Sequence, residues 1–356
     1  MRYLIVSSYP PIHCGIGKYA FQMAWTLTDQ GSVVNILSPP EGDGDYTIEL
    51  QGGFSLLRIF LYAFFYDRVV IQYQPSFFYS YGTSSWHLNT LATHLSFMLL
   101  FLVLGKRLEI VVHEFSNTSS RKRDMRERLG HCLEVTKWKL CPHIVFHTPK
   151  ELEDFSAQYF RPSETKYELR PHNLYFHKFT DITMEEARRE LGLPHDKIIF
   201  LCIGFIQPHK GFDLALRAFC RAKTENMELY IVGSIRLSLE PYQAYLDLLR
   251  NIAERTHNAR LVVKYLTDQE FDTWISACDV VIVPYREIWS SGVAARAKLF
   301  HKPLIVSEAG GLKDQIAKED LFFHDEEDLA SILDQFSRLV TSSHVPEGAG
   351  LPTSSI

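Results

Sequence analysis

Short apolar runs rich in β-branched residues alternate with amphipathic stretches along the first half of the chain. Runs of this length predict buried strands, and the stretches between them predict helices or loops. The alternation is typical of βαβ units in a parallel, doubly wound sheet. The predicted strands span residues 3–6, 33–37, 68–73, 108–114 and 143–148.

A polar stretch over residues 169–197 interrupts this pattern. Within it, Thr183 followed three residues later by Glu186 predicts a helix start with a capping box. Beyond it the alternation resumes, with predicted strands at 198–205, 229–234, 260–266, 280–285 and 303–308. The pattern therefore predicts an α/β chain with two doubly wound parallel-sheet (Rossmann-like) domains.

The domain boundaries follow from the same pattern. The N-terminal domain is predicted at 1–172, the linker at 173–182 and the C-terminal domain at 183–340. Residues 341–356 are small, polar and rich in Pro and Gly, which predicts a disordered tail.

Two segments are unusually apolar. Residues 91–105 fall short of the roughly 20 residues that a membrane span needs and include His94, so we predict a buried helix there. Residues 54–67 are rich in aromatic side chains and predict a helix packed on the sheet. The alternative for this second segment is contact with a bilayer surface or with a lipid-linked substrate.

Composition narrows the function classes. With 356 residues and 46% hydrophobic side chains, the chain can bury two cores. Its net charge of -5 argues against a nucleic-acid partner. Six scattered cysteines without a C-x-x-C motif indicate reduced thiols, and the N-terminus lacks a signal-peptide pattern, so we expect a cytoplasmic location.

Ligands of doubly wound sheets bind at the carboxyl ends of strands, and two such domains create a cleft. Gly15, Gly17 and Ala20 have the spacing of a dinucleotide-binding fingerprint. The preceding strand ends too early, however, and no carboxylate follows the strand at 33–37 to bind a ribose. We therefore expect no NAD, while a phosphorylated or acidic ligand near this glycine loop stays open.

Two strand ends in the C-terminal domain carry candidate anion sites. Gly204 and then Lys210 follow the strand at 198–205, where an ammonium group and a helix N-terminus would suit a diphosphate. Ser290, Ser291 and Gly292 open another helix after the strand at 280–285. A solvated turn lysine and ordinary helix caps are the alternative interpretations.

Two further clusters are weaker. Cys141, His143 and His147 resemble metal spacing, but strand residues four apart are separated by about 13 Å, so no metal site is predicted. The basic run at 121–128 predicts a solvated loop and helix start, or else a groove for an anionic acceptor or a bilayer surface.

Several segments in order resemble one enzyme family. "GF…KGFDLALRAF", "LYIVGS", "YLTDQEFDTWISACDVVIVPYRE" and "SSGVAARA…KPLIVSEAGGL" are similar to the donor domain of retaining GT-B glycosyltransferases, family 4 (glycosyl transferases group 1). "SSYPPIHCGIGKYAFQMAWTL", "YDRVVIQYQP" and "VVHEF" resemble its acceptor domain. The resemblance covers about residues 1–340.

The resemblance implies a GT-B fold with an interdomain cleft and a glycosyltransferase that retains anomeric configuration without an essential metal. The implied donor is a UDP- or GDP-linked sugar, and no separate cofactor is needed. The implied acceptor is a glycan, a lipid-linked sugar or a small molecule, in polysaccharide or glycoconjugate synthesis. Peripheral contact with the inner face of a membrane is compatible with such an acceptor.

The resemblance also implies site residues. His113 and Lys210 match the family residues that hydrogen-bond the donor sugar and neutralise the leaving diphosphate, and Glu287 is the candidate carboxylate near the donor sugar. The remaining implied substrate-binding positions are Gly15, Gly17, Gly204, Tyr265, Leu266, Ser290, Ser291, Gly292, Val293 and Arg296.

The sequence departs from the family pattern at charged positions. Phe205 and Ile206 stand where the family often has a phosphate-binding arginine. Ile288 and Arg296 stand where it has two glutamates eight residues apart, so Glu287 serves as the first only with a one-residue shift. We expect Arg296 to compensate for the missing arginine. The departures leave two alternatives open: a non-catalytic nucleotide-sugar-binding scaffold, or a nucleotide-sugar epimerase of the same fold.

Overall fold

The protein consists of two compact α/β units, Met1–Tyr175 and Phe176–Ile356, in a computed structural model. The structure describes every residue except 80–85, 116–124, 165, 224, 236–238 and 343–356. The division falls inside the predicted linker 173–182. Most of the predicted disordered tail lies outside the described residues, and its first two residues, 341 and 342, belong to the last helix.

The N-terminal unit is built on a seven-stranded sheet in the order β3-β2-β1-β4-β5-β6-β7, with all neighbouring strands parallel. Its strands are β1 (Arg2–Val6), β2 (Val33–Ser38), β3 (Tyr46–Thr47), β4 (Arg68–Tyr73), β5 (Leu108–Val112), β6 (Ile144–Phe146) and β7 (Tyr167–Leu169). The five predicted strands are confirmed. The short edge strands β3 and β7 escaped prediction because two or three residues show no periodicity.

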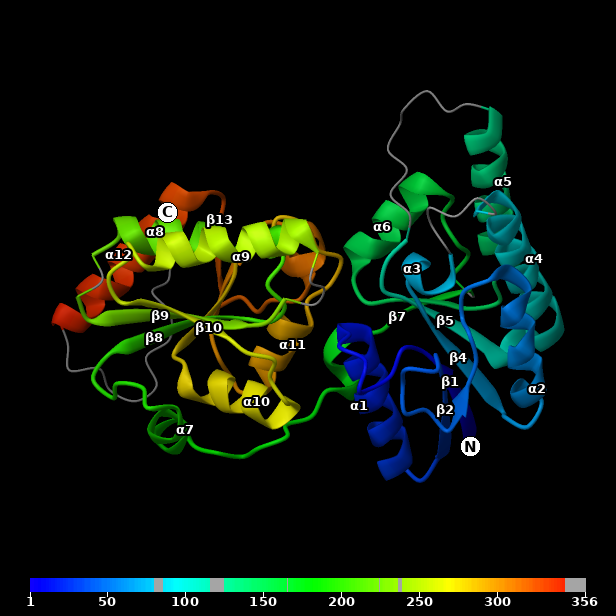
Figure 1. The fold of residues 1–356 in the computed structure, drawn as a ribbon, viewed down its shortest axis with the longest axis horizontal. Coiled ribbons are helices and arrows are strands. Elements are labelled where there is room, and N and C mark those ends of the chain that lie inside the picture. Colours follow the sequence, from blue (N-terminus) through cyan, green and yellow to red (C-terminus); the bar gives the residue numbers. More distant parts are fainter. Residues whose placement is uncertain (80–85, 116–124, 165, 224, 236–238, 343–356) are drawn as a thin grey trace. The chain divides into compact units, whose positions relative to one another are not determined.

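The helices of this unit cover both faces of its sheet. Helix α1 lies on one face, and α2, α4 and α5 gather on the other (Figure 1). The helices are α1 (Gly15–Asp29), α2 (Phe60–Ala63), α3 (Pro75–Phe78), α4 (Trp86–Leu104), α5 (Met125–Leu140) and α6 (Pro149–Gln158). Three 3₁₀ turns join them, η1 (Gly53–Ile59), η2 (Gly105–Arg107) and η3 (His172–Tyr175).

The two apolar segments differ from their predictions. Residues 91–105 are helical within α4, but Leu95, Leu99 and Leu102 are exposed, so the helix is buried on one side only. Residues 54–67 form η1 and α2 in place of one regular helix, and Phe64 and Phe65 are exposed. The predicted burial at 91–105 is confirmed on one side of the helix, where Phe97 and Leu100 are buried, and residues 54–67 bury Leu56 and Ile59. Apolar composition alone does not say which face stays exposed. The basic run 121–128 lies largely outside the described residues.

The C-terminal unit has a six-stranded parallel sheet in the order β10-β9-β8-β11-β12-β13. Its strands are β8 (Ile198–Ile203), β9 (Met227–Gly233), β10 (Ala259–Val263), β11 (Val280–Val283), β12 (Leu304–Ser307) and β13 (Leu321–Phe323). All seven residues of β9 are buried, as expected for a central strand covered on both faces.

Helices α8, α9 and α12 cover one face of this sheet, and α7 and α10 the other (Figure 1). The helices are α7 (Met184–Leu191), α8 (Phe212–Arg221), α9 (Glu240–Ala253), α10 (Asp268–Ala277), α11 (Gly292–Leu299) and α12 (Glu326–Ser342), with 3₁₀ turns η4 (Pro208–Lys210) and η5 (Gly310–Asp314). The predicted capping box at the start of α7 is confirmed, since Thr183 and Glu186 exchange side-chain and backbone hydrogen bonds.

Each sheet has one point where the winding direction reverses. In the N-terminal unit it lies between β1 and β4, and in the C-terminal unit between β8 and β11. The loops after the two strands at such a point diverge to opposite faces of the sheet, and the crevice between them is where ligands bind in open α/β sheets. We therefore expect a ligand-binding site at each of these two edges.

Candidate functional site

Two loops meet at the reversal point of the C-terminal sheet. The loop after β8 contains Gly204 and leads through η4 to Lys210, and the loop after β11 runs from Pro284 to Ser291. Gly211 has a left-handed backbone with φ of 61°, and a Cβ there would overlap the carbonyl oxygen of Pro284. The contact between the two loops therefore requires glycine at this position.

Lys210 is held against an aromatic ring at this contact. Its Nζ lies 3.8 Å from the centre of the Tyr285 ring, a cation–π contact. Within the described part of the chain the ammonium has no carboxylate partner. Burial lowers the pKa of Lys210 to about 7, because a cation removed from water without a counter-ion loses solvation. An anion placed beside it would restore the charged form.

An ion pair between exposed Arg286 and buried Asp213 positions η4. Arg286 donates two hydrogen bonds to Asp213, with 2.8 and 2.7 Å between nitrogen and oxygen, and a third to the carbonyl of Pro208. Burial alone would raise the pKa of Asp213, but hydrogen bonds from Arg286 and Tyr245 bring it below its usual range. Arg286 therefore ties the loop after β11 to the turn that carries Lys210.

Helix α11 begins beside these loops. Ser291 is its N-cap and accepts a hydrogen bond from the backbone N–H of Ala294, while the Gln315 side chain bonds both backbone groups of Ser291. Gly292 and Val293 form the first turn, and a Cβ on Gly204 would lie 3.6 Å from a Val293 methyl group. The structure thus brings Gly204 and Val293 together, and Lys210 follows in the same loop. A helix N-terminus at such a place attracts anions.

The charged candidates near α11 have different surroundings. Glu287 is exposed and makes no ion pair or hydrogen bond with any described residue. The Arg296 side chain is buried and donates to Asp272, to Asp268 and to the Asp268 carbonyl, all on α10. Because three of its nitrogens are bonded to α10, we interpret Arg296 as a residue that holds α10 and α11 together and no longer expect it to contact a phosphate.

Tyr265 and Leu266 follow β10, two strands from the reversal point. Leu266 is buried, whereas Tyr265 is half-buried and its ring lies 6.5 Å from that of Phe205. Their place at the carboxyl end of the sheet fits the predicted base-binding role, which stays a prediction.

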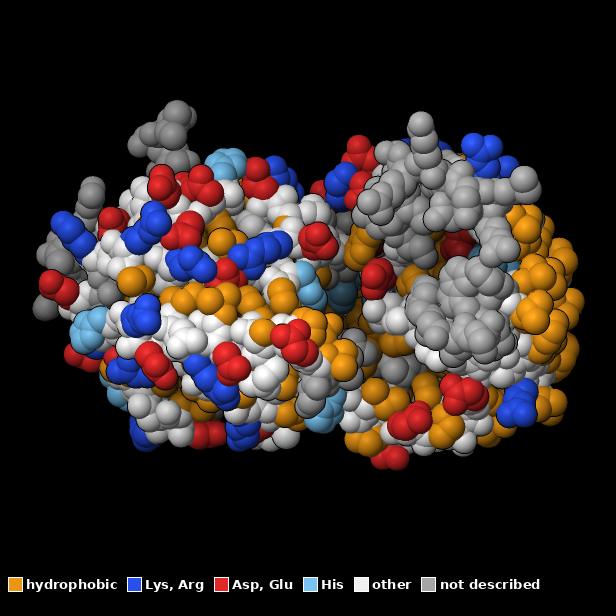
Figure 2. Space-filling view, turned by 45° about the horizontal axis from the view of Figure 1, so that its top comes forward, with side chains coloured by type: hydrophobic (Ala, Val, Ile, Leu, Met, Phe, Trp, Pro, Cys, Tyr) orange, Lys and Arg blue, Asp and Glu red, His pale blue; other side chains and the backbone are white. Residues whose placement is uncertain are grey.

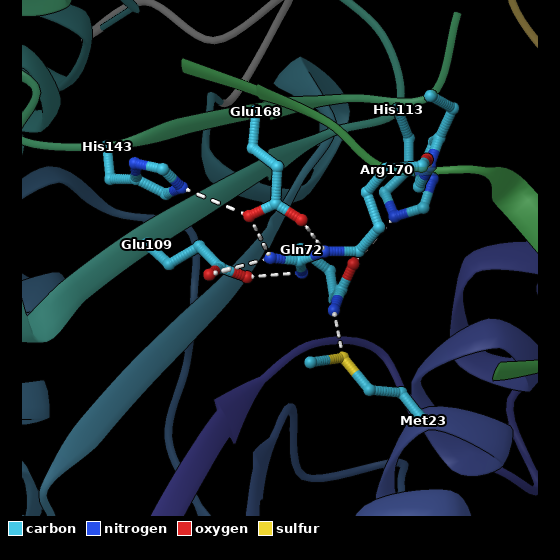
Figure 3. A network of polar contacts seen from close by, with 8 residues as sticks. Met23, Gln72, Glu109, His113, His143, Glu168 and Arg170 are labelled. Atoms are coloured by element: carbon cyan, nitrogen blue, oxygen red, sulfur yellow. Dashed lines mark hydrogen bonds and ion pairs between the residues drawn. The ribbon is translucent and has the colours of Figure 1, made fainter. Parts of the chain in front are cut away.

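Three histidines gather at the corresponding edge of the N-terminal sheet. His113 follows β5, His147 follows β6, and His172 lies just past β7. All three rings surround the buried ring of Tyr19, with centroid distances of 5.1, 5.3 and 5.2 Å. His113 Nε2 shares a 2.7 Å hydrogen bond with the Oε1 of Gln72, which is fully buried in β4 (Figure 3).

These imidazoles are uncharged at neutral pH. Burial is the main cause that lowers the pKa of His147 to about 4, and it holds the pKa of His113 and His172 well below the usual range. His147 Nδ1 lies 3.0 Å from the carbonyl oxygen of Arg170, and its Nε2 is buried with no hydrogen-bond partner in the described chain. A cluster of neutral rings can exchange hydrogen bonds with uncharged hydroxyl groups.

The glycine loop immediately precedes Tyr19, the residue at the centre of this cluster, in the sequence. Helix α1 begins at Gly15, and its N-cap Cys14 makes no side-chain hydrogen bond. A Cβ on Gly17 would lie 3.2 Å from the carbonyl oxygen of Ser8, so this glycine lets α1 approach the end of β1. The Ser7 and Ser8 hydroxyls are buried without a partner among the described residues. The edge therefore offers polar groups that a ligand hydroxyl could satisfy.

Glu109, His143 and Glu168 lie close enough to share a metal ion. Arg170 already bonds both carboxylates, at 2.6 and 3.0 Å to Glu109 and 2.8 Å to each oxygen of Glu168 (Figure 3). The guanidinium supplies the positive charge that this pair of carboxylates needs. We interpret the group as an ion network that fixes the end of β7.

Comparison with known proteins finds similarity to one enzyme family in the C-terminal part of the chain. A profile described as "Glycosyl transferases group 1" matches residues 183–351. The C-terminal unit is therefore similar to this family over nearly its whole length. The chain is also 30% identical over 212 residues to the D-inositol 3-phosphate glycosyltransferase of Stackebrandtia nassauensis, a match that spans 56% of this chain and 46% of that protein. The chain thus spans about half the length of this curated relative.

Solved structures extend the likeness in fold to both units of the chain. Sucrose-phosphate synthase from Thermosynechococcus elongatus has a TM-score of 0.68 at 16% identity, covering 96% of this chain and 90% of that one. HepE of Anabaena, in complex with UDP and glucose, has a TM-score of 0.63 at 14% identity, covering 94% and 89%. At these identities the likeness shows the fold, and it confirms the predicted GT-B fold.

Sequence reasoning missed several residues at these edges. Tyr19, His147 and His172 were not assigned to a binding site, and the Arg286–Asp213 pair was not foreseen. No strand-end signal in the sequence existed for two of them, because His147 falls inside the strand predicted at 143–148 and the short strand β7 before His172 was not predicted. Asp213, the partner of Arg286, lies 73 positions away in the sequence, and no local sequence pattern predicts such a pair.

Proposed function

We propose that this protein is a retaining glycosyltransferase that moves a sugar from a UDP- or GDP-linked donor to a glycan, lipid-linked or small-molecule acceptor. The observation that carries the proposal is Lys210, a half-buried ammonium without a carboxylate partner in the described chain, at the reversal point of a domain similar to the glycosyl transferases group 1 family. A fixed cation that stabilises the charge developing on a leaving diphosphate is the main requirement of such a reaction.

The proposal assigns the donor diphosphate to the C-terminal unit. Lys210 and the first-turn N–H groups of α11 would stabilise the negative charge of this diphosphate. The reaction is therefore proposed to need no metal. Gly204, Ser290, Ser291, Gly292 and Val293 would form the backbone cradle, Tyr265 and Leu266 would hold the base, and Glu287 remains the candidate carboxylate near the sugar.

The N-terminal unit is proposed to bind uncharged sugar hydroxyls. Its histidines are neutral, and the buried Nε2 of His147 and the hydroxyls of Ser7 and Ser8 have no partner in the described chain. His113, held by Gln72, is proposed to hydrogen-bond a hydroxyl group, with Gly15 and Gly17 beside it. The six free thiols support the cytoplasm as the compartment.

The test combines binding with turnover. Thermal unfolding is measured with UDP, GDP, ADP and NAD, because a ligand at 100 times its dissociation constant adds about 2.7 kcal/mol to stability. The wild type is compared with Lys210→Ala and with Lys197→Ala, a lysine at the amino end of β8 whose ammonium pairs with Glu228. We expect a shift with UDP or GDP that only Lys210→Ala abolishes.

Turnover then separates the alternatives. A donor that shifts the melting temperature is incubated with an acceptor panel, and the anomeric configuration of the product is determined by proton NMR. Binding without transfer to any acceptor would favour the scaffold, and a changed sugar formed from donor alone would favour an epimerase. The absence of a shift with every nucleoside diphosphate would contradict the proposal itself.

A further inference from the structure

Helix α4 is apolar on both sides and buries three of its polar residues. It contains no Asp, Glu, Lys or Arg. The polar residues Thr93, His94 and Ser96 point inward and are only 1%, 2% and 1% exposed. Leu95 and Leu102, on the outward side, are 44% and 66% exposed. A surface helix normally buries its apolar stripe and exposes its polar one, so this arrangement needs an explanation.

The inward polar groups of α4 are bonded within the N-terminal unit. The hydroxyl of Ser96 donates to the carbonyl of Gly53 in η1, and that of Thr93 to the carbonyl of Asn89. His94 contacts the Tyr79 hydroxyl through Nδ1 and the Glu134 carboxylate through Nε2. Because buried polar groups must keep their partners, α4 cannot rotate to hide its leucines.

The outward leucines continue into a larger surface. Helix α4 packs on η1, and η1, α2 and the two residues after α2 add four exposed side chains to this surface. We call this surface the apolar patch, and Figure 2 shows hydrophobic side chains gathered on the corresponding right-hand side of the view. Its members are Phe54, Leu61, Phe64, Phe65, Leu88, Leu91, Leu95, Leu99, Leu102 and Val103, each at least 40% exposed. Contiguous exposed patches of this kind mark sites of membrane or protein contact.

The charges near the apolar patch in the sequence indicate whether it contacts a membrane or a protein. Between Glu49 and Glu109 the sequence has a single acidic residue, Asp67, and Asp67 pairs with Arg2. The same stretch has four basic residues, Arg58, Arg68, Lys106 and Arg107. The whole chain carries a net charge of -5, so this stretch is positively charged within a negatively charged chain. A hydrophobic surface bordered by cations matches the chemistry of a bilayer with anionic headgroups.

We propose that the apolar patch lies on an anionic bilayer surface, with α4 parallel to the membrane plane and its leucines at the boundary between headgroups and acyl chains. By length and composition, Leu88–Arg107 could also cross a membrane, but its inner face is bonded to η1 and to the residues around Glu134. The helix therefore lies on the bilayer and does not span it. Arg58 and Lys106, both exposed, face the headgroups.

The experiment is co-sedimentation of the full chain with vesicles of phosphatidylcholine alone or mixed with phosphatidylglycerol. We expect binding to the mixed vesicles, weaker binding to the neutral ones, and a loss of the difference at high salt. The double variant Leu95→Gln/Leu102→Gln should bind about tenfold more weakly, because two exposed leucines no longer enter the acyl boundary. The matched control Leu239→Gln/Leu248→Gln changes two exposed leucines of the C-terminal unit and should bind as the wild type does.

A second pair of substitutions tests the charges. Arg58→Gln/Lys106→Gln should reduce the preference for phosphatidylglycerol while leaving the weaker binding to phosphatidylcholine unchanged. Circular dichroism melts show whether each variant is folded, and all the changed side chains are exposed. Absence of vesicle binding by the wild type, or equal losses in patch and control variants, would overturn the proposal. So would a chain that sediments as a dimer, becomes a monomer in the Leu95/Leu102 variant and ignores vesicles, since a second copy would then cover the patch.

Discussion

The carboxyl edges of the two sheets hold desolvated titratable side chains at equivalent points. The side chains at one edge are neutral, and the side chain at the other keeps part of its charge. At the N-terminal edge His113, His147 and His172 lie around Tyr19 with lowered pKa values, so burial makes them neutral. At the C-terminal edge burial also lowers the pKa of Lys210, to about 7, but a lysine starts so high that a charged fraction remains at neutral pH. The same desolvation thus leaves one edge uncharged and the other partly cationic.

The largest expected effect is acid sensitivity of the N-terminal unit. The folded-state pKa of His147, about 4, lies below the unfolded value near 6.5, so the unfolded state binds more protons between these values. Stability is therefore lost as pH falls from 6.5 to 4, by roughly 3 kcal/mol for His147 alone. Hydrogen exchange at pH 6.5 and 4.5 should show faster opening of β5 and β6 than of β8 and β11. Equal acceleration in both units would contradict the contrast.

The next effect concerns the backbone of the C-terminal edge. Gly211→Ala combines a positive φ with an overlap against the Pro284 carbonyl and should cost about 3 kcal/mol in the free energy of unfolding. Gly192→Ala is the matched control, because Gly192 has φ of 66° and open space around its Cα, so it should cost only about 1 kcal/mol. Urea denaturation measures both. Similar losses in the two variants would mean that the contact between η4 and the loop after β11 is unimportant.

The pH dependence of ligand binding sharpens the comparison further. A diphosphate prefers the charged form of Lys210, so affinity for the nucleoside diphosphate should fall above pH 7, approaching tenfold per pH unit up to pH 9. Lys210→Arg keeps its charge and should flatten this profile. Isothermal titration calorimetry at pH 7, 8 and 9 provides the measurement. A steep profile that survives in Lys210→Arg would assign the titration to another group.

The smallest expected effect belongs to the ion pair behind Lys210. Arg286→Met removes the hydrogen bonds to Asp213 and Pro208 while keeping part of the side-chain bulk, so η4 is held less firmly. Nucleotide affinity should fall about fivefold, near 1 kcal/mol, with the pH profile unchanged, because Arg286 acts through position and not through contact. Arg250→Met, at an exposed pair on α9, serves as the control. A change in the shape of the pH profile would place Arg286 in contact with the ligand.

Much of the fold could be predicted because its strands are buried on both faces. Residues 280–283 are wholly β-branched and residues 69–71 likewise, because a buried parallel strand leaves little freedom in composition. Strands β3, β7 and β13 are too short to show a period, and the exposed face of α4 could not be inferred from a helix that is apolar all round.

Some residues of the candidate site could likewise be predicted from the sequence, and others could not. The positions of Lys210 and Ser291 after strands could be predicted from the local pattern, whereas His113 was assigned through the resemblance to the family. The partner of Arg296 could not, since the guanidinium contacts Asp272 on another helix, and the predicted phosphate contact is no longer expected for that reason.

The sequence by itself determined two doubly wound sheets, the order of their strands along the chain and the glycine and lysine positions at their ends, because these depend on periodicity and near neighbours. Only the tertiary structure decided that Lys210 rests on Tyr285 without a carboxylate, that three histidines share Tyr19, and that α4 exposes its leucines. Each of these depends on groups far apart in the chain whose solvation is set by what packs around them. Burial, charge state and exposure are properties of the packed chain and not of a residue type.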